Sequence, residues 1–319
     1  LIKRWGSQAV ILAGLPCYAV CLTGLGLAPS LPFLAAALFL FGFASNTFNI
    51  ALNAQAVDVE CLYKRPIMST FHGMWSLGGV AGGTLGAIVA PLGLPPLPHF
   101  IIMCAVTCLV TFSVRHRILP HDLPRKFTPK KHRGFTMPSC FILLLGFIAF
   151  SNMATEGTMY DWSAVYFAQV VRPGEALVRA GYIACMICMV CCRFIADRLV
   201  VRFGAIRVLQ FGGLCTAAGF LLACLVPTLP AATAGFAMVG FGMAPAIPLC
   251  YSLTSKSRTV SPSVAISIIS TISFFGMLAS PAGVGMLSHV FGLQTALMPL
   301  AAMGLSIIVL APLLTRAER

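Results

Sequence analysis

The sequence reads Cys192-Arg-Phe-Ile-Ala-Asp-Arg-Leu-Val-Val-Arg-Phe-Gly204 between two long apolar runs, near 177–196 and 207–226. Each run has about the 20 residues that an α-helix needs to cross the hydrocarbon core of a bilayer. The charged residues of the quoted stretch therefore lie in a short connector between two predicted membrane spans.

Eight further apolar runs of similar length occupy most of the chain. They lie near 8–28, 31–54, 70–91, 97–114, 138–160, 230–253, 263–287 and 293–313. Charged residues make up 9% of the chain and hydrophobic residues 59%, whereas soluble domains carry about 25% charged residues. Lipid offers the backbone no hydrogen-bond partners, so runs of this length must be helical. The sequence predicts an all-α polytopic membrane bundle and excludes a water-soluble fold.

The formal net charge is +13, and lysine and arginine gather in alternate connectors. Cytoplasmic connectors retain such residues. The predicted cytoplasmic group contains Lys3, Arg4, Lys64, Arg65, the stretch 115–133, Arg198, Arg202, Arg207, Lys256, Arg258, Arg316 and Arg319. Topology and attraction to anionic lipid headgroups explain the charge without a nucleic-acid partner. The central loop and the C-terminus are therefore expected in the cytoplasm.

The most polar part of the chain lies near its centre and combines basic residues with prolines. It predicts a cytoplasmic linker at 115–137. This linker would separate a four-span bundle at 1–114 from a six-span bundle at 138–319.

One offset of 198 residues aligns the two halves, and it places Leu1-Ile-Lys-Arg-Trp-Gly6 on Leu199-Val-Val-Arg-Phe-Gly204. The same offset pairs Gly14 with Gly212, Gly42 with Gly240, and Gly78 with Gly276. Transporters are often built from internal repeats, with the solute bound near the middle of the membrane. The alignment therefore predicts an internal duplication.

The connector resembles the signature of the major facilitator superfamily, Gly-x-x-x-Asp-Arg-x-Gly-Arg-Arg. The match covers Asp197, Arg198 and Arg202, while Cys192 or Arg193 and Ala196 depart from the glycine positions. The resemblance implies two pseudo-symmetric halves of six spans, with the signature between the second and third span of each half. The chain would then present ten of an expected twelve spans and lack the first two.

Three further stretches resemble a bacterial branch of sugar-permease-like carriers of the YbjJ type, found in the inner membrane. They are Asn49-Ile-Ala-Leu-Asn53, Arg65 to Gly79, and Glu156-Gly-Thr-Met-Tyr-Asp-Trp-Ser163. The resemblance implies a secondary transporter in the bacterial inner membrane that works by alternating access. Its expected solute is a small polar metabolite, a sugar or an organic acid. Drug efflux and a transport-inactive fragment are the alternatives.

Glu156 and Asp161 are carboxylates in or near a predicted span. A carboxylate at lipid depth is costly and often marks a proton or solute path, so Glu156 is a candidate for proton coupling. Asn152 and Trp162 lie close in sequence and are further candidates. Gly157 invites a helix break, and the carboxylates could instead cap a half-helix or lie at the outer water interface.

Polar residues also recur on two earlier spans. Asn46, Asn49 and Asn53 have helical spacing and form one predicted polar stripe, which could bind a solute or join helices. His72 and Trp75 lie within one turn of the next span, where they could contact the solute or anchor the helix at the interface.

Asp197, Arg198 and Arg202 are expected at a cytoplasmic gate. The repeat offset aligns Asp58 and Glu60 with Lys256 and Arg258. This alignment predicts two ion pairs, Glu60 with Arg4, and Asp197 with Lys256 or Arg258.

Thirteen cysteines lie mostly inside apolar runs, where they pack as small hydrophobic residues. The sequence predicts neither a metal site nor a cofactor, and it contains no protease signature. The expected partners are a small solute, protons and the lipid bilayer. The expected protein is not an enzyme, and a monomer is the expected state.

Overall fold

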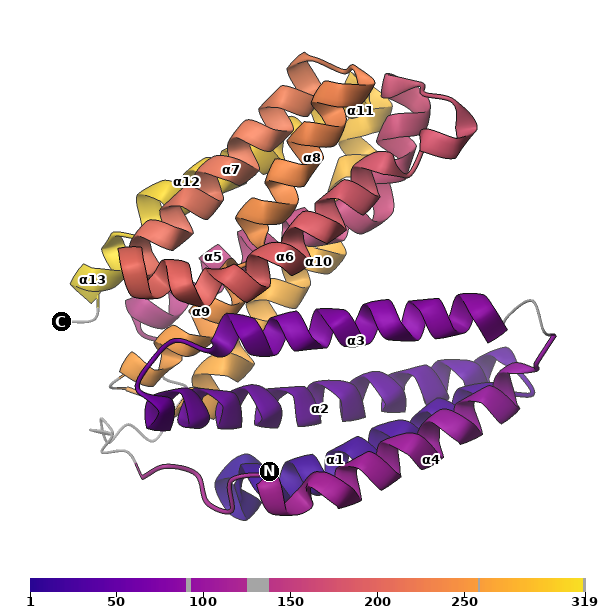
Figure 1. Cartoon of the computed structure of the whole chain (residues 1–319), viewed down its shortest axis with the longest axis vertical. Helices are drawn as coiled ribbons and strands as arrows, with labels where there is room; N and C mark the ends of the chain where they lie inside the picture. The colour runs from indigo at the N-terminus through magenta and orange to yellow at the C-terminus, as the bar shows by residue number, and fades with distance from the viewer. Residues whose placement is uncertain (90–92, 125–137, 258, 318–319) are drawn as a thin grey trace. The chain divides into compact units, whose positions relative to one another are not determined.

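The computed structural model describes residues 1–89, 93–124, 138–257 and 259–317, and every regular element in this part of the chain is a helix. The helices of the first part are α1 (Ile2–Gly26), α2 (Leu31–Tyr63), α3 (Met68–Val89) and α4 (Pro96–Val114) (Figure 1). Those that follow are α5 (Cys140–Tyr166), α6 (Ala180–Phe203), α7 (Ala205–Leu225), α8 (Leu229–Met243), α9 (Ala246–Leu253), α10 (Pro262–Phe291), α11 (Leu293–Ala296), α12 (Met298–Leu310) and α13 (Leu313–Ala317). The predicted all-α fold is confirmed.

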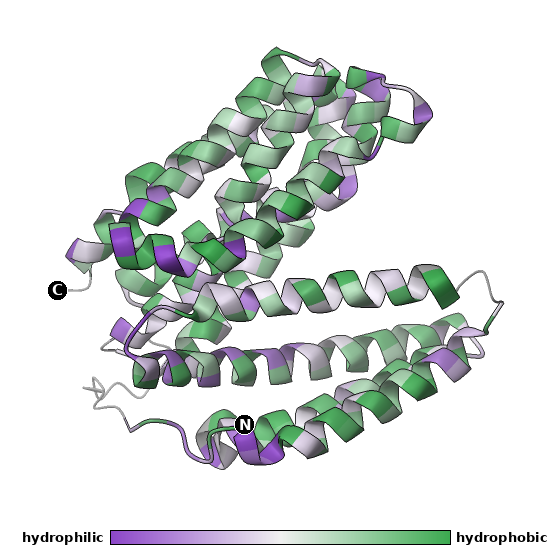
Figure 2. Cartoon of the chain, viewed as in Figure 1, coloured by the Kyte–Doolittle hydropathy of each residue, from purple (hydrophilic) through white to green (hydrophobic). Residues whose placement is uncertain are grey.

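Hydrophobic residues cover most of several long helices, whereas α3 is paler because it is rich in glycine, serine and threonine (Figure 2). In the described residues, 8 helical stretches are long and apolar enough to cross a membrane. The other two predicted spans lie in α3 and α6, helices of 22 and 24 residues. The total of ten spans stays a prediction.

The chain divides into two compact units. The first comprises Leu1–Leu62 and Leu77–Lys126, and the second comprises Tyr63–Ser76 and Phe127–Arg319. The beginning of α3 therefore packs as part of the second unit. The linker predicted at 115–137 lies mainly outside the described residues.

The repeat alignment pairs two glycines with the same backbone conformation. Gly6 has φ 78° and ψ 163°, and Gly204 has φ 84° and ψ 152°. Side-chain-bearing residues rarely adopt this conformation. Each glycine interrupts or ends a helix, which explains why both copies of the basic turn finish with glycine.

In the second unit, α5 and α10 pack closely at glycines. A side chain added at Gly276 would place its Cβ 2.6 Å from the carbonyl oxygen of Phe150. Pro281 has no N–H, so the carbonyl of Met277 lacks its usual helical donor. A Cβ added at Gly157 would lie 2.6 Å from that carbonyl oxygen. The break predicted at Gly157 is wrong, because α5 runs unbroken and this glycine serves close helix packing.

An aromatic cluster forms the core of the second unit at one end of α5. The side chains of Tyr166, Phe167 and Phe236 are fully buried, and neighbouring ring centroids lie 5.5 to 6.4 Å apart. The Tyr166 hydroxyl donates to the carbonyl oxygen of Ala223 at 2.7 Å. This cluster packs the end of α5 against α7 and α8.

Candidate functional site

Glu156 is buried in the middle of α5, with only 3% of its surface exposed. The Tyr160 hydroxyl, one turn further on, donates to its Oε1 at 2.9 Å. Its Oε2 has no hydrogen-bond partner among the described residues. A buried carboxylate oxygen without a partner is costly, so this oxygen is available for a proton or a ligand.

Further polar side chains lie near Glu156 along α5 and on α6. Asn152 lies one turn before it, is 3% exposed, and its Nδ2 has no acceptor in the described part of the chain. On α6, Tyr182 and Cys185 would interact electrostatically with the charged form of Glu156. The rings of Tyr160 and Tyr182 are 6.2 Å apart. Asn152 and Glu156 thus lie one turn apart on α5, and each has one buried polar atom without a partner among the described residues.

The remaining candidates on α5 differ in their surroundings. Asp161 is exposed, whereas the Trp162 indole N–H donates to the carbonyl oxygen of Pro281 at 2.9 Å. Nearby, the Thr158 and Ser280 hydroxyls lie 2.8 Å apart. Trp162 therefore joins α5 to α10. Asp161 is an exposed carboxylate on the same helix, so it serves as the control residue when Glu156 is mutated.

Arg193 was not singled out from the sequence as a site residue, although it lies inside an apolar run. Its side chain is 3% exposed and donates from Nη1 to the Ser76 hydroxyl. Its Nε has no acceptor in the described part of the chain. Its charge acts on His72 of α3 and Tyr160 of α5. The signal that could have found it is a charged residue within a predicted span.

His72 and Trp75 have different environments. The His72 Nε2 is buried and has no hydrogen-bond partner among the residues described, and its ring centroid lies 5.9 Å from that of Tyr251. Trp75 is 66% exposed. Ser76 lies one turn after His72 and donates to the His72 carbonyl oxygen. His72 therefore belongs with Arg193 and Ser76 in a polar cluster.

Asp197 caps the beginning of α3. Its carboxylate accepts hydrogen bonds from the backbone N–H of Ser69 at 3.0 Å and of Thr70 at 2.8 Å. It also accepts one from the Thr70 hydroxyl at 2.6 Å. The first N–H groups of a helix lack internal partners, and a negative charge there is favourable. Asp197 thus binds the end of α6 to the start of α3.

We expect Asp197→Ala to destabilise the protein by about 1–2 kcal/mol, because the first turn of α3 loses its capping carboxylate. Thermal unfolding of the purified protein in detergent measures this change. Arg198→Ala is the matched control, because Arg198 is the exposed neighbour on the same helix and its loss should change stability by less than about 0.5 kcal/mol. Equal melting temperatures for both variants would contradict the capping role.

The other predicted gate residues stay predictions. Arg202 and Arg4 are exposed, and the predicted pair of Arg4 with Glu60 is untested. Asp197 uses both carboxylate oxygens for α3, and its predicted pairing with Lys256 or Arg258 remains a prediction. Arg258 lies outside the described residues.

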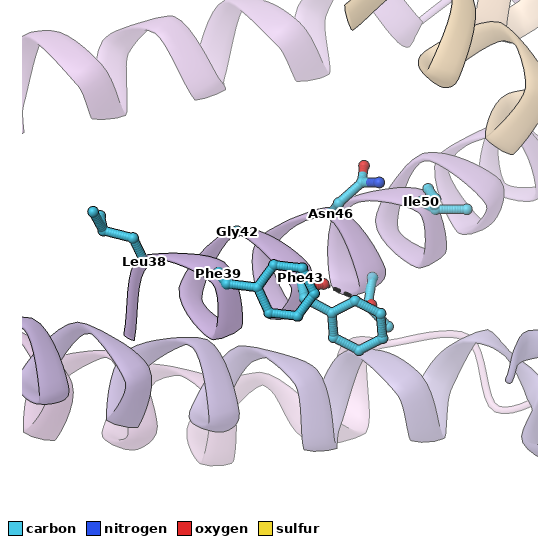
Figure 3. Close-up of a pocket in the computed structure, with 7 residues that line it drawn as sticks. Leu38, Phe39, Gly42, Phe43, Asn46 and Ile50 are labelled. Atoms are coloured by element: carbon cyan, nitrogen blue, oxygen red, sulfur yellow. Dashed lines mark hydrogen bonds between the residues drawn. The ribbon is translucent and has the colours of Figure 1, made fainter. Parts of the chain in front are cut away.

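The asparagine stripe on α2 borders an open hollow of about 530 Å³. Its lining residues are Leu38, Phe39, Gly42, Phe43, Asn46, Thr47 and Ile50 (Figure 3). All belong to α2, so the hollow is a surface of one helix. Asn53 donates to the carbonyl oxygen and to Oδ1 of Asn49, both at 2.9 Å. Asn46 is exposed and is the member of the stripe that faces the hollow.

Long apolar helices with buried charged residues are typical of polytopic membrane transporters. A sequence model of the Major Facilitator Superfamily matches residues 1–264. The chain belongs to this superfamily and is a secondary transporter with its fold.

Two relatives support this assignment. An uncharacterized transporter of Sinorhizobium fredii is 34% identical over 301 residues, which are 93% of this chain and 78% of the relative. An uncharacterized MFS-type transporter of Yersinia pestis is 31% identical over 321 residues, or 99% of this chain and 81% of the relative.

Solved structures show the same fold. The fucose:proton symporter FucP of E. coli has a TM-score of 0.77 at 16% identity, covering 98% of this chain and 85% of that chain. The human organic anion transporter TETRAN has a TM-score of 0.74 at 17% identity, covering 96% and 77%.

Proposed function

We propose that the chain moves a small polar solute, a sugar or an organic acid, across the bacterial inner membrane by alternating access coupled to proton movement. The observation that carries this proposal is the burial of Glu156 with Oε2 unpartnered. The similar fold of a fucose:proton symporter is consistent with both the solute class and the coupling ion.

Glu156 would exchange the proton. Tyr160 donates to Oε1, so Oε2 is the oxygen that takes up the proton when the site opens to the outside. Protonation removes a charge that is costly at lipid depth, and the neutral, loaded site can then close and reopen to the cytoplasm. Release of the proton there would complete one transport step.

Asp197 would act at the cytoplasmic gate. The proposed orientation places the basic connectors, the central loop and the C-terminus in the cytoplasm. The hydrogen bonds of Asp197 to Ser69 and Thr70 would then lie on the cytoplasmic side and break as that side opens. Arg198, Arg202, Arg4 and Glu60 are proposed to form and exchange ion pairs around this contact. The four-span and six-span bundles, at 1–114 and 138–319, are proposed as the two rocking bodies.

Uptake into proteoliposomes tests the proposal. The purified protein is reconstituted and offered a panel of radiolabelled sugars and carboxylic acids, with and without a pH gradient that is acidic outside. We expect at least one solute to accumulate above its external concentration with the gradient, and a protonophore to abolish this accumulation. Gradient-driven extrusion of ethidium, with none of the polar solutes moved, would contradict the proposal and favour drug efflux.

A further inference from the structure

Two buried nitrogen atoms of the second unit have no hydrogen-bond partner in the described part of the chain. They are Nε of Arg193 on α6 and Nε2 of His72 on α3. Arg193 makes one side-chain hydrogen bond, from Nη1 to the Ser76 hydroxyl. Buried polar groups are nearly always paired, so both atoms are available to a bound group.

Arg193 is buried on α6, near the cytoplasmic end of the span predicted at 177–196. Its side chain is 3% exposed. Asp197, one turn further along the same helix, holds the start of α3. The guanidinium group is therefore surrounded by protein side chains and not by bulk water.

Arg193 makes no ion pair with the acidic side chains of the described residues. Glu156 instead keeps its hydrogen bond from Tyr160. A buried cation is normally paired with an anion. Ser76, which accepts a hydrogen bond from Arg193, lies one turn after His72 on α3. A carboxylate bound beside this serine would accept hydrogen bonds from Arg193 and from a protonated Nε2 of His72.

The surroundings of this cluster suit a small organic anion. The Tyr251 ring lies 5.9 Å from the His72 ring, and the Tyr251 hydroxyl pairs with the Ser270 hydroxyl at 2.8 Å. Residues from α3, α6, α9 and α10 thus combine a cation, an imidazole, hydroxyls and an aromatic face. A planar guanidinium group fits a carboxylate through two parallel hydrogen bonds.

We infer that Arg193 and His72 bind the carboxylate of an anionic solute, so that the carrier transports an organic acid or sugar acid and not a neutral sugar. This inference rests on the proposed function and narrows its substrate class. The proton taken by Glu156 and the carboxylate held by Arg193 would then move together.

The melting temperature of the protein, measured with three organic acids and separately with three neutral compounds of similar size, tests the inference. The full chain, purified in detergent, is melted with lactate, gluconate and galacturonate, and separately with glycerol, glucose and galactose. A ligand that binds the folded state raises its melting temperature. We expect the acids to raise it by about 2 °C or more and the neutral compounds to leave it unchanged. Arg193→Gln should abolish the response to the acids, and Arg207→Gln, which changes an exposed arginine on α7, should keep it.

Each contrary outcome has a distinct meaning. Stabilisation by the neutral compounds alone, unchanged in Arg193→Gln, would overturn the anionic solute while leaving the proposed transport of a polar solute intact. Stabilisation by neither mixture would also overturn the inference, and the uptake panel would decide the proposed function separately.

Arg193→Lys keeps the test valid if Arg193→Gln fails to fold. Lysine retains the charge but cannot form two parallel hydrogen bonds. The affinity for the acids should fall about tenfold or more, and an unchanged affinity would overturn the inference.

Discussion

Glu156→Gln is expected to abolish proton-driven accumulation while solute counterflow continues. Glutamine has nearly the same shape and can still accept the hydrogen bond that Tyr160 gives to Oε1, but it cannot take up and release a proton. Loss of a proton-transferring group typically costs about 10²- to 10⁴-fold in rate. We expect accumulation driven by the pH gradient to fall at least 10²-fold, as measured by radiolabelled uptake into proteoliposomes.

Asp161→Asn is the matched control for this prediction. Asp161 lies on the same helix but is exposed, so its neutralisation should leave proton-driven uptake within about threefold of the wild-type rate. Counterflow shows that the Glu156→Gln protein is folded and still binds solute. Equal losses of uptake in the two variants would contradict the special role of Glu156.

Gly240→Ala is expected to destabilise the folded protein more than other single-methyl changes. A Cβ at Gly240 on α8 would overlap the backbone carbonyl of Cys185 on α6. Backbone cannot move aside as a flexible side chain can, so the cost should lie at or above the upper end of the usual 1–3 kcal/mol for overpacking. We expect a large loss of monodisperse protein on size-exclusion chromatography and a lower melting temperature.

Gly42→Ala is the control, because Gly42 aligns with Gly240 in the internal repeat. Among the described residues, nothing lies within 4 Å of a Cβ at Gly42, and alanine favours the helix by about 1 kcal/mol relative to glycine. This variant should be as stable as the wild type or more so. A Gly240→Ala protein that melts like Gly42→Ala would show that α6 and α8 pack less closely than described.

The sequence predicted the features that depend on residues close together along the chain. Apolar runs of membrane length predicted the helices, and the aligned basic turns located Gly6 and Gly204, which share a backbone conformation. The sequence left open whether Glu156 lies within the bundle or at the water interface, and the structure shows it buried.

Contacts between distant residues could not be predicted in the same way. Asp197 caps a helix 128 residues earlier in the chain, and Arg193 donates to a serine 117 residues earlier. The close packing at Gly157 depends on the carbonyl of Met277 in another helix, which leaves no room for a Cβ at this position. No local sequence pattern predicts these contacts between distant residues. From the sequence alone Arg193 is a departure from the signature motif, whereas the structure shows a buried cation.

The most direct test of the account is the pH inside proteoliposomes that contain the purified protein and a trapped pH-sensitive dye. A solute identified by the uptake panel is added outside, without an imposed gradient. Coupled transport predicts that the lumen acidifies as the solute enters the wild-type vesicles and that Glu156→Gln vesicles show no change. Solute entry at the full rate with constant internal pH in the wild type would contradict proton coupling.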